Sequence, residues 1–362
     1  MIKKAMMVKR IYNNPEVYYG KGATGMVLKA IDAENVLVLV SPTVQQSEYY
    51  GKILGALDDR QVREEPVSTP EQATVLDLVQ KYTADWWPSV IVAIGGGKVL
   101  DVAKVMRVLM INPGVTFEDL EKNRFCENSE IKFVAVPTTP GTGSETNSIA
   151  VLRTPEGTKI PYINSGFVPD IAILDHEFLM GHDLQALMEF AADIFAHAFE
   201  GSVSPASSTL LGAIAKSSMS LLGSALDRLK EDPKDPKALG DLLYAGHLAG
   251  IVQGNAFVGA CHALAHAIEP QVHVSHGMAI LLTLKQTLLW LKETTQKQDY
   301  DEFITAYDAM GFDAFRKAEI LAGIDPDNWA DAALADPSIS TSPVRMKKDN
   351  ILVLIDWILN RS

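Results

Sequence analysis

The chain has 362 residues, of which 47% are hydrophobic and 21% charged, and its formal net charge is −13. This is the composition of an ordinary globular protein with a sizeable core, and it excludes disorder, collagen-like repeats and low-complexity arrays. The acidic balance argues against nucleic acid and anionic membranes as partners, because like charges repel.

Apolar runs of strand length alternate with helical patterns in the first half of the chain. A helix is expected from Thr69 as N-cap, with Pro70 at its first position, and another begins near Val99. Unbroken apolar strands that alternate with helices are typical of a parallel sheet covered on both faces. The predicted strands are 36–40, 89–94, 133–136 and 171–174.

No strand pattern follows residue 180, and the pattern of the second half predicts helices. We therefore predict an α/β domain over residues 1–178 and an all-helical domain over residues 179–362. Ligands of open parallel sheets bind at the carboxyl ends of the strands, so we expect the active site in a cleft between the two domains. The predicted helices are 183–204, 207–229, 237–268, 277–295 and 350–359.

Two glycine-rich segments compete as phosphate-binding loops. The segment 20–25 matches the pattern G-x-G-x-x-G, but 13–15 interrupts the approach and no acidic residue ends the following strand. We interpret it as a glycine turn that opens a helix. The segment 95–101, Gly-Gly-Gly-Lys-Val-Leu-Asp, follows a clean strand and opens a helix, so backbone N–H groups can approach a pyrophosphate there.

Side chains around this second loop complete the predicted cofactor site. Lys98 adds a positive charge, and Asp101 is expected to cap backbone donors in the first helical turn. A polar loop at 137–145 follows the next strand, where hydroxyls suit a ribose or phosphate; by itself it is also a common connector. The candidate cofactor residues here are Gly95, Gly96, Gly97, Lys98, Asp101, Thr138, Thr139, Thr142 and Ser144.

Carboxylate and imidazole side chains recur at helical spacing in the second half. Asp193 and His197 are four residues apart, as are His262 and His266, and His276 follows closely. A single such pair is usually a surface salt pair, but two pairs and a third histidine in an apolar domain form a ligand set for Fe²⁺ or Zn²⁺. We interpret the remaining histidines as surface or packing residues.

These motifs together, 95–104, 137–145 and the Asp193–His276 series, resemble the iron-containing (group III) alcohol dehydrogenases. That superfamily includes glycerol dehydrogenase and dehydroquinate synthase. The resemblance implies a Rossmann-like N-terminal domain, an NAD(P) cofactor and one divalent metal. It places His266 beside the nicotinamide and substrate as the catalytic residue, and Lys159 near the cofactor ribose. The implied metal ligands are Asp193, His197, His262 and His276.

The implied reaction moves a hydride between NAD(P)(H) and a small alcohol or aldehyde, with the metal polarising the substrate oxygen. Glycerol-dehydrogenase-like polyol oxidation stays open, because Lys98 is similar to the glycerol dehydrogenases. A dehydroquinate-synthase-like lyase also stays open, although few basic residues surround the metal motifs. These motifs select no exact substrate and leave an anionic aldehyde possible as one; they also fit either direction of reaction and more than one divalent metal.

Three further expectations concern the cofactor and the cellular setting. Ser41 stands where NAD-specific sites carry an acid, so NADP(H) is favoured. Two cysteines, Cys126 and Cys261, fit a reducing compartment, and the apolar stretch within 1–10 is too short for a signal peptide. No apolar run nears a membrane span. We expect a cytoplasmic homodimer without membrane or nucleic-acid partners.

Overall fold

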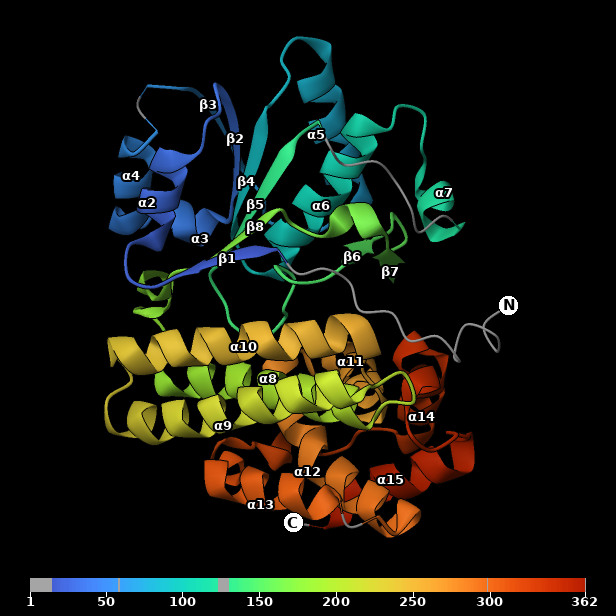
Figure 1. The fold of residues 1–362 in the computed structure, drawn as a ribbon. Helices are drawn as coiled ribbons and strands as arrows, with labels where there is room; N and C mark the ends of the chain where they lie inside the picture. Colours follow the sequence, from blue (N-terminus) through green and yellow to red (C-terminus); the bar gives the residue numbers. More distant parts are fainter. Residues whose placement is uncertain (1–14, 58, 123–129, 298, 362) are drawn as a thin grey trace. The chain divides into compact units, whose positions relative to one another are not determined.

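The computed structural model describes residues 15–57, 59–122, 130–297 and 299–361 (Figure 1). The chain divides into two compact units, and the division follows Gly181. Each unit has its own buried hydrophobic core. Our expectations for residues 1–10 and for Cys126 lie outside the described residues; Cys261 is a free, buried cysteine.

The first unit contains a six-stranded sheet in which every pair of neighbours is parallel, in the order β1-β8-β5-β4-β2-β3. All four predicted strands are present. Two edge strands, β1 and β3, were missed, because an exposed edge has no continuous apolar run to detect. The strands are β1 (Glu16–Tyr19), β2 (Asn35–Val40), β3 (Gln61–Pro66), β4 (Val90–Gly95), β5 (Lys132–Pro137) and β8 (Ile171–Leu174).

Helices cover both faces of this sheet, as predicted. Val36, Val38 and Val40 pack against α2 (Ala23–Ala30) and α4 (Glu48–Gly55) on one face. Leu37 and Leu39 pack on the other face, together with α5 (Gln72–Ala84) and α6 (Gly97–Ile111). Successive side chains of a strand point to opposite faces, so a run without polar residues requires an apolar layer on each side.

The predicted start of the first long helix is wrong by two residues. The helix α5 begins at Gln72 with Glu71 as N-cap, and it has no capping side chain. The backbone before it stays extended, because the Pro70 carbonyl accepts a hydrogen bond from the amide of Arg153 at 2.8 Å and Glu71 forms a bridge with the same residue. Arg153 belongs to a small antiparallel hairpin, β6 (Ile149–Arg153) and β7 (Lys159–Ile163), which we did not predict.

The second unit consists of helices, and its described residues contain no strand. The predicted helix 237–268 is two helices, α10 and α11, whose axes differ by 103°. The chain turns at Phe257, whose φ of 63° is incompatible with a right-handed helix. The helices are α8 (Leu184–Val203), α9 (Thr209–Glu231), α10 (Pro236–Ala256), α11 (Ala260–Val272), α12 (His276–Thr295), α13 (Tyr300–Met310), α14 (Pro326–Ala335) and α15 (Lys348–Asn360).

One described helix, α9, has the length and composition of a membrane span, or up to two spans if the bent pair α10–α11 is counted as one. Buried leucines and alanines line one side of α9, and the helix packs beside α8 and α10 (Figure 1). A core helix of a water-soluble protein passes the same test, so this finding is weak support for a membrane span.

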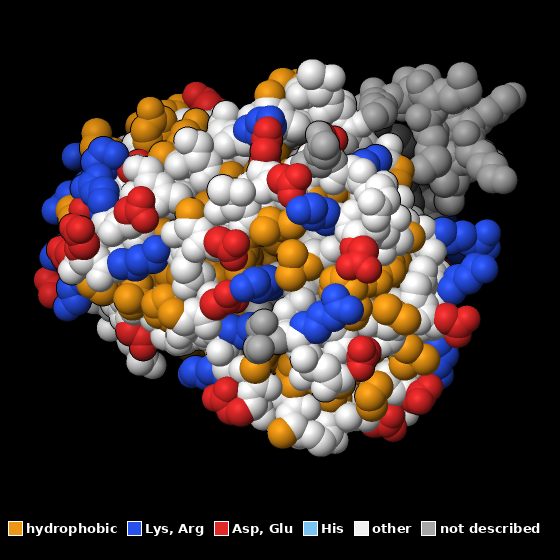
Figure 2. Space-filling model, turned by 90° about the horizontal axis from the view of Figure 1, so that it is seen from below, with side chains coloured by type: hydrophobic (Ala, Val, Ile, Leu, Met, Phe, Trp, Pro, Cys, Tyr) orange, Lys and Arg blue, Asp and Glu red, His pale blue; other side chains and the backbone are white. Residues whose placement is uncertain are grey.

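Charged side chains of both signs share the face seen in Figure 2, with apolar side chains between them. The helical unit carries ion pairs on its surface, for example Lys216 with Glu302 at 2.9 Å and Lys348 with Asp331 at 2.8 Å. Exposed pairs of this kind contribute at most about 1 kcal/mol each, so they keep the surface polar rather than hold the fold together.

Candidate metal centre and cofactor loops

A polar stripe runs along the otherwise apolar helix α8. Asp193, His197 and Glu200 are spaced by four and three residues, so they share one face of the helix, and all three are buried. Charged side chains are rarely buried unless they are paired or bind a metal.

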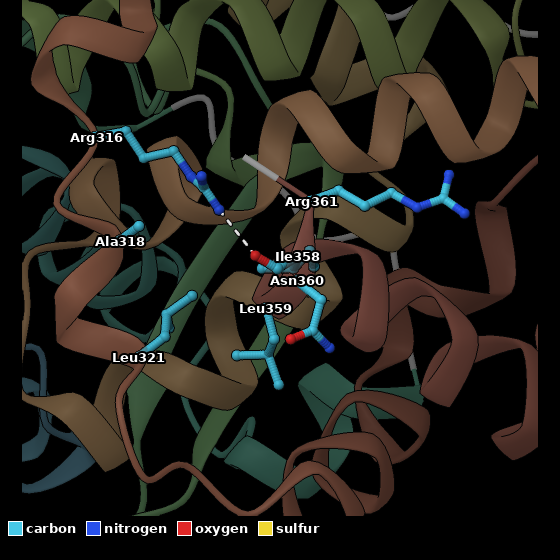
Figure 3. Close-up of a pocket in the computed structure, with 7 residues that line it drawn as sticks. All are labelled: Arg316, Ala318, Leu321, Ile358, Leu359, Asn360 and Arg361. Atoms are coloured by element: carbon cyan, nitrogen blue, oxygen red, sulfur yellow. Dashed lines mark hydrogen bonds between the residues drawn. The ribbon is translucent and has the colours of Figure 1, made fainter.

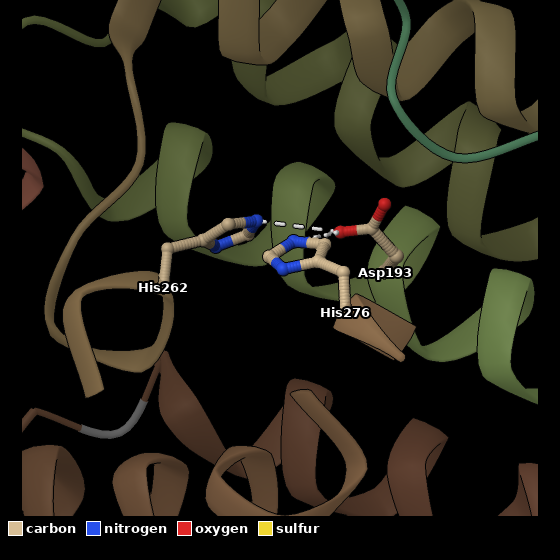
Figure 4. A group of neighbouring side chains, drawn as sticks. All are labelled: Asp193, His262 and His276. Atoms are coloured by element: carbon tan, nitrogen blue, oxygen red, sulfur yellow. Dashed lines mark ion pairs between the residues drawn. The ribbon is translucent and has the colours of Figure 1, made fainter. Parts of the chain in front are cut away.

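Three helices bring their polar residues together at Asp193. Its Oδ1 atom lies 3.3 Å from Nε2 of His262 in α11 and 3.4 Å from Nε2 of His276, the first residue of α12 (Figure 4). The three side chains each offer one ligand atom, and these atoms lie within 4.8 Å of one another. We predicted four metal ligands. Three of them, Asp193, His262 and His276, have ligand atoms within this distance of one another.

The predicted fourth ligand, His197, lies beside this group. Its Nδ1 atom is 3.7 Å from Oδ1 of Asp193, and its ring stacks on that of His262 with centroids 4.5 Å apart.

A cation fits the chemistry of this group. Oδ1 of Asp193 and Nε2 of His262 are buried, and neither has a hydrogen-bond partner among the described residues. Burial disfavours the Asp193 carboxylate, but the nearby charges of His197 and His276 outweigh this effect, so the pKa of Asp193 lies well below the ordinary value. One carboxylate and several imidazoles are a suitable donor set for Fe²⁺ or Zn²⁺.

The predicted catalytic residue, His266, lies next to the group and is partly exposed. Its ring stacks on that of His276 with centroids 5.2 Å apart, and its Nδ1 atom lies 2.9 Å from Oδ2 of Asp336. Burial lowers the pKa of His266, and the opposing effect of Asp336 does not compensate. Burial thus favours the neutral imidazole, and Asp336 orients one of its nitrogens.

Sequence reasoning missed the carboxylates that face the Nδ1 atoms of these histidines. Glu200 lies 2.6 Å from Nδ1 of His262, and Glu269 lies 3.4 Å from Nδ1 of His276. Of these, Glu200 had a detectable signal, because it continues the helical face of Asp193 and His197. Asp336 follows α14, far along the chain, and nothing in the sequence connects it to His266.

In the sheet unit, the predicted cofactor residues follow the carboxyl ends of three adjacent strands, β2, β4 and β5. The amide of Ser41 donates to the carbonyl of Ile94 at 3.1 Å, and that of Thr138 donates to Gly95 at 3.1 Å. After β2 the chain leads to helix α4 on one face of the sheet, and after β4 it leads to α6 on the other. Such a divergence is the topological switch point at which open parallel sheets bind ligands.

The three glycines of the 95–97 loop each have a packing reason. A Cβ on Gly95 would meet Val99 at 2.5 Å, one on Gly96 would meet Oγ1 of Thr139 at 2.9 Å, and one on Gly97 would meet Thr142 at 3.1 Å. Close contacts with Val99 in α6 and with the polar loop therefore leave little room for a side chain at these three positions. The helix α6 has no capping side chain, so backbone N–H groups of its first turn are available to an anion.

The prediction that Asp101 caps the first turn of α6 is wrong. Its carboxylate instead accepts hydrogen bonds from Oγ of Ser144 at 2.6 Å and from the amide of Val151 at 2.9 Å. Buried Lys104 adds bonds to Asn147 and Ile149, at 3.0 and 2.6 Å. Asp101 and Ser144 thus tie the polar loop to α6.

Replacing Asp101 with Ala is expected to lower the free energy of unfolding by about 1–3 kcal/mol, because the Ser144 hydroxyl and the Val151 amide lose their acceptor. The loosened loop should also raise KM for the cofactor. Thermal unfolding and cofactor titration measure the two effects. A variant with unchanged stability would contradict this role for Asp101.

The remaining predicted cofactor residues lie on the surface of the same unit. Lys98, Thr142 and Lys159 are exposed, and Lys159 is the first residue of β7. Ser41 is the N-cap of the short helix α3 (Pro42–Gln45), where its hydroxyl accepts from the amide of Val44 at 3.3 Å.

The interpretation of 20–25 as a turn that opens a helix is confirmed. Gly22 has a φ of 74° and precedes α2, and Asp175 accepts hydrogen bonds from the amides of Gly22 and Thr24 at 3.2 and 3.0 Å. A carboxylate of the protein already occupies this helix terminus. A strand, β1, does precede the turn, contrary to our expectation.

A small pocket in the helical unit is separate from the histidine cluster (Figure 3). Arg316 donates a hydrogen bond to the carbonyl of Ile358 at 3.0 Å across it. None of the predicted site residues lines this pocket; its residues are Arg316, Ala318, Leu321, Ile358, Leu359, Asn360 and Arg361.

Comparison with known proteins identifies the class. Residues 14–176 match the family "Iron-containing alcohol dehydrogenase", and residues 189–320 match "Fe-containing alcohol dehydrogenase family, C-terminal". A 1-propanol dehydrogenase of Salmonella typhimurium is 30% identical over 74% of this chain and 70% of its own length. The NADPH-dependent butanol dehydrogenase of Clostridium saccharobutylicum is 27% identical over 77% of this chain and 73% of its own.

A solved structure agrees with this assignment at the level of fold. The sulfoacetaldehyde reductase of Bifidobacterium kashiwanohense, crystallised with NAD⁺, superposes with a TM-score of 0.83 at 19% identity, covering 98% of this chain and all of its own. The matched families define a metal-dependent oxidoreductase of the alcohol dehydrogenase class. The chain belongs to the iron-containing alcohol dehydrogenase family, as the motifs indicated.

Proposed function

We propose that Asp193, His197, His262 and His276 hold one divalent metal ion, and that the enzyme interconverts a small alcohol and its aldehyde. The observation that carries the proposal is the pair of buried atoms without hydrogen-bond partners, Oδ1 of Asp193 and Nε2 of His262, 3.3 Å apart. Burying two such atoms without partners is costly, and a metal ion bound by both would remove that cost.

When bound, the metal polarises the substrate oxygen, and the nicotinamide donates or accepts the hydride. The chain's own residues arrange the site. Asp193 supplies the negative charge on which the imidazoles converge, and the buried setting of His262 strengthens electrostatic interactions there.

His266 is the proposed proton carrier. Its Nδ1 atom is held by Asp336 at 2.9 Å, which leaves Nε2 to exchange a proton with the substrate oxygen. Its partial exposure gives that proton a route to solvent, and its lowered pKa favours the neutral ring that can accept the proton.

The cofactor is proposed to bind at the switch point of the sheet, on the 95–97 loop and the neighbouring polar loop. Its pyrophosphate would meet the uncapped N-terminus of α6, with Lys98 nearby. The two cofactor forms both have precedent among the relatives: the butanol dehydrogenase is NADPH-dependent, and the reductase was crystallised with NAD⁺.

The decisive experiment is a panel of small aldehydes, including anionic ones, assayed with NADH and NADPH. Metal-stripped protein is supplied with Fe²⁺ or Zn²⁺ separately. Loss of reduced-cofactor absorbance only after metal addition supports the proposal. Equal rates with and without metal would contradict it.

We expect NADPH to be accepted at least as well as NADH, because Ser41 can donate a hydrogen bond to a 2′-phosphate and no carboxylate repels it there. Ser41→Asp should penalise NADPH relative to NADH by roughly 1–3 kcal/mol through like-charge repulsion. The values of kcat/KM for both cofactors on one aldehyde measure this effect.

The matched control is Ser41→Asn, which is neutral. Asp and Asn are both good N-caps, so either variant preserves the start of α3. Only the charged variant should shift the preference. A tenfold or greater preference of the unmodified enzyme for NADH would overturn the prediction. The homodimer and the cytoplasmic location stay predictions from the sequence.

A further inference from the structure

We infer that Glu200 is a positioning residue that holds His262 in the orientation and tautomer required to bind the metal. This inference rests on the metal site proposed above. Glu200 is no member of the predicted ligand set, and it is 3% exposed, so solvent does not stabilise its charge.

The carboxylate of Glu200 contacts the ring of His262 and the backbone amides of Cys261 and His262. Its Oε2 atom lies 2.6 Å from Nδ1 of His262, and its Oε1 atom accepts a hydrogen bond from the amide of Cys261 at 2.7 Å. The amide of His262 also donates to Oε2, at 3.4 Å. One carboxylate from α8 therefore contacts both the ring of His262 and the backbone that carries it.

A carboxylate can only accept hydrogen bonds, so the Nδ1 atom of His262 must carry a proton. In the neutral imidazole the proton-free nitrogen is then Nε2, the atom that faces Oδ1 of Asp193. Metal-binding imidazoles need this arrangement, and a partner on the other nitrogen also raises their basicity.

Glu200 has a second, structural role that the test must separate. The helix α11 begins after Gly259 without a capping side chain of its own, and Glu200 accepts hydrogen bonds from its first amides. A Cβ on Gly259 would meet Oε1 of Glu200 at 3.0 Å, so the carboxylate lies directly against the helix start. Loss of this cap alone would lower stability without changing metal affinity.

The variant Glu200→Gln separates the two roles. If the amide oxygen keeps the bond from Cys261, the amide nitrogen faces Nδ1 of His262 and donates to it, which moves the ring proton to Nε2. We expect the affinity of the full chain for Zn²⁺ and Co²⁺ to fall roughly 10–100-fold. Competition with a chelator measures the affinity, and the visible spectrum of bound Co²⁺ should show an altered ligand field.

Two further variants complete the test. Glu200→Asp keeps an acceptor but withdraws it by one methylene, so its affinity should lie between those of the original chain and Glu200→Gln. Asp183→Ala removes the N-cap of α8 and should lower the melting temperature without changing metal affinity.

A folded Glu200→Gln variant whose affinity is within twofold of the original overturns the inference. If that variant does not fold, a folded Glu200→Asp variant with unchanged affinity also overturns it, and failure of both to fold assigns Glu200 to the fold alone. Absence of metal binding by the unmodified chain would instead contradict the proposed function.

Discussion

Asp193→Ala is expected to remove the metal and to lower turnover roughly a thousandfold or more, because metal polarisation supplies several kcal/mol of transition-state stabilisation. Its Oδ1 atom is the point on which the imidazoles converge, at 3.3 Å from His262 and 3.4 Å from His276. The sheet unit has its own core and should stay folded. Elemental analysis and steady-state kinetics measure the two losses, and His262→Ala should behave in the same way.

The control is a histidine from the same stretch of chain that makes no contact with Asp193. His273 is exposed and ends α11 with a φ of 52°, a conformation that asparagine tolerates. His273→Asn should therefore keep full metal content and activity. Full metal occupancy in both Asp193→Ala and His262→Ala would show that the metal binds elsewhere or not at all.

Gly96→Val is expected to raise KM for the cofactor strongly while metal content stays unchanged. The backbone of Gly96 is extended, with φ −74° and ψ −177°, so its conformation does not require glycine. The space around Gly96 does disfavour a side chain, because a Cβ would lie 2.9 Å from Oγ1 of Thr139. A valine must push the polar loop away and fill the approach to the N-terminus of α6, where the pyrophosphate is proposed to bind.

Gly25→Val is the matched control. Gly25 lies inside α2, and a Cβ there would meet nothing within 4 Å. We expect a small loss of stability at most and unchanged cofactor binding. If Gly25→Val impaired the cofactor and Gly96→Val did not, the phosphate site would lie at 20–25. Melting temperatures of both variants separate a binding defect from a folding defect.

The central strands were predictable and the edge strands were not, for one physical reason. Val36–Val40 and the core of β4 are buried on both faces, so every position is apolar and the run stands out. The strand β3 pairs only with β2 and exposes most of its residues, and its sequence, Gln-Val-Arg-Glu-Glu-Pro, carries no such run. A strand that is buried on both faces therefore has a continuous apolar run that can be detected in the sequence, and an exposed edge strand does not.

Helix ends were less predictable, because partners outside the helix decide them. Asp101 lies at a position where a carboxylate often stabilises a helix start. Its oxygens instead accept hydrogen bonds from the hydroxyl of Ser144 in the polar loop and from the amide of Val151 in β6. Pro70 precedes α5 because its carbonyl is bonded to Arg153. In each case a hydrogen bond from a distant segment replaced the local one.

The sequence by itself determined the family, the parallel sheet, the helical second half, and the pairing of Asp193 with His197 on one face of a helix, since helical periodicity alone sets that spacing. The family resemblance implied that His262 and His276 join Asp193, and the tertiary structure brings them there. Only the tertiary structure decided that His197 lies at the margin of the group and that carboxylates from three places in the chain face the imidazoles. Contacts between helices depend on how α8, α11, α12 and the segment after α14 pack, and no local periodicity encodes that packing.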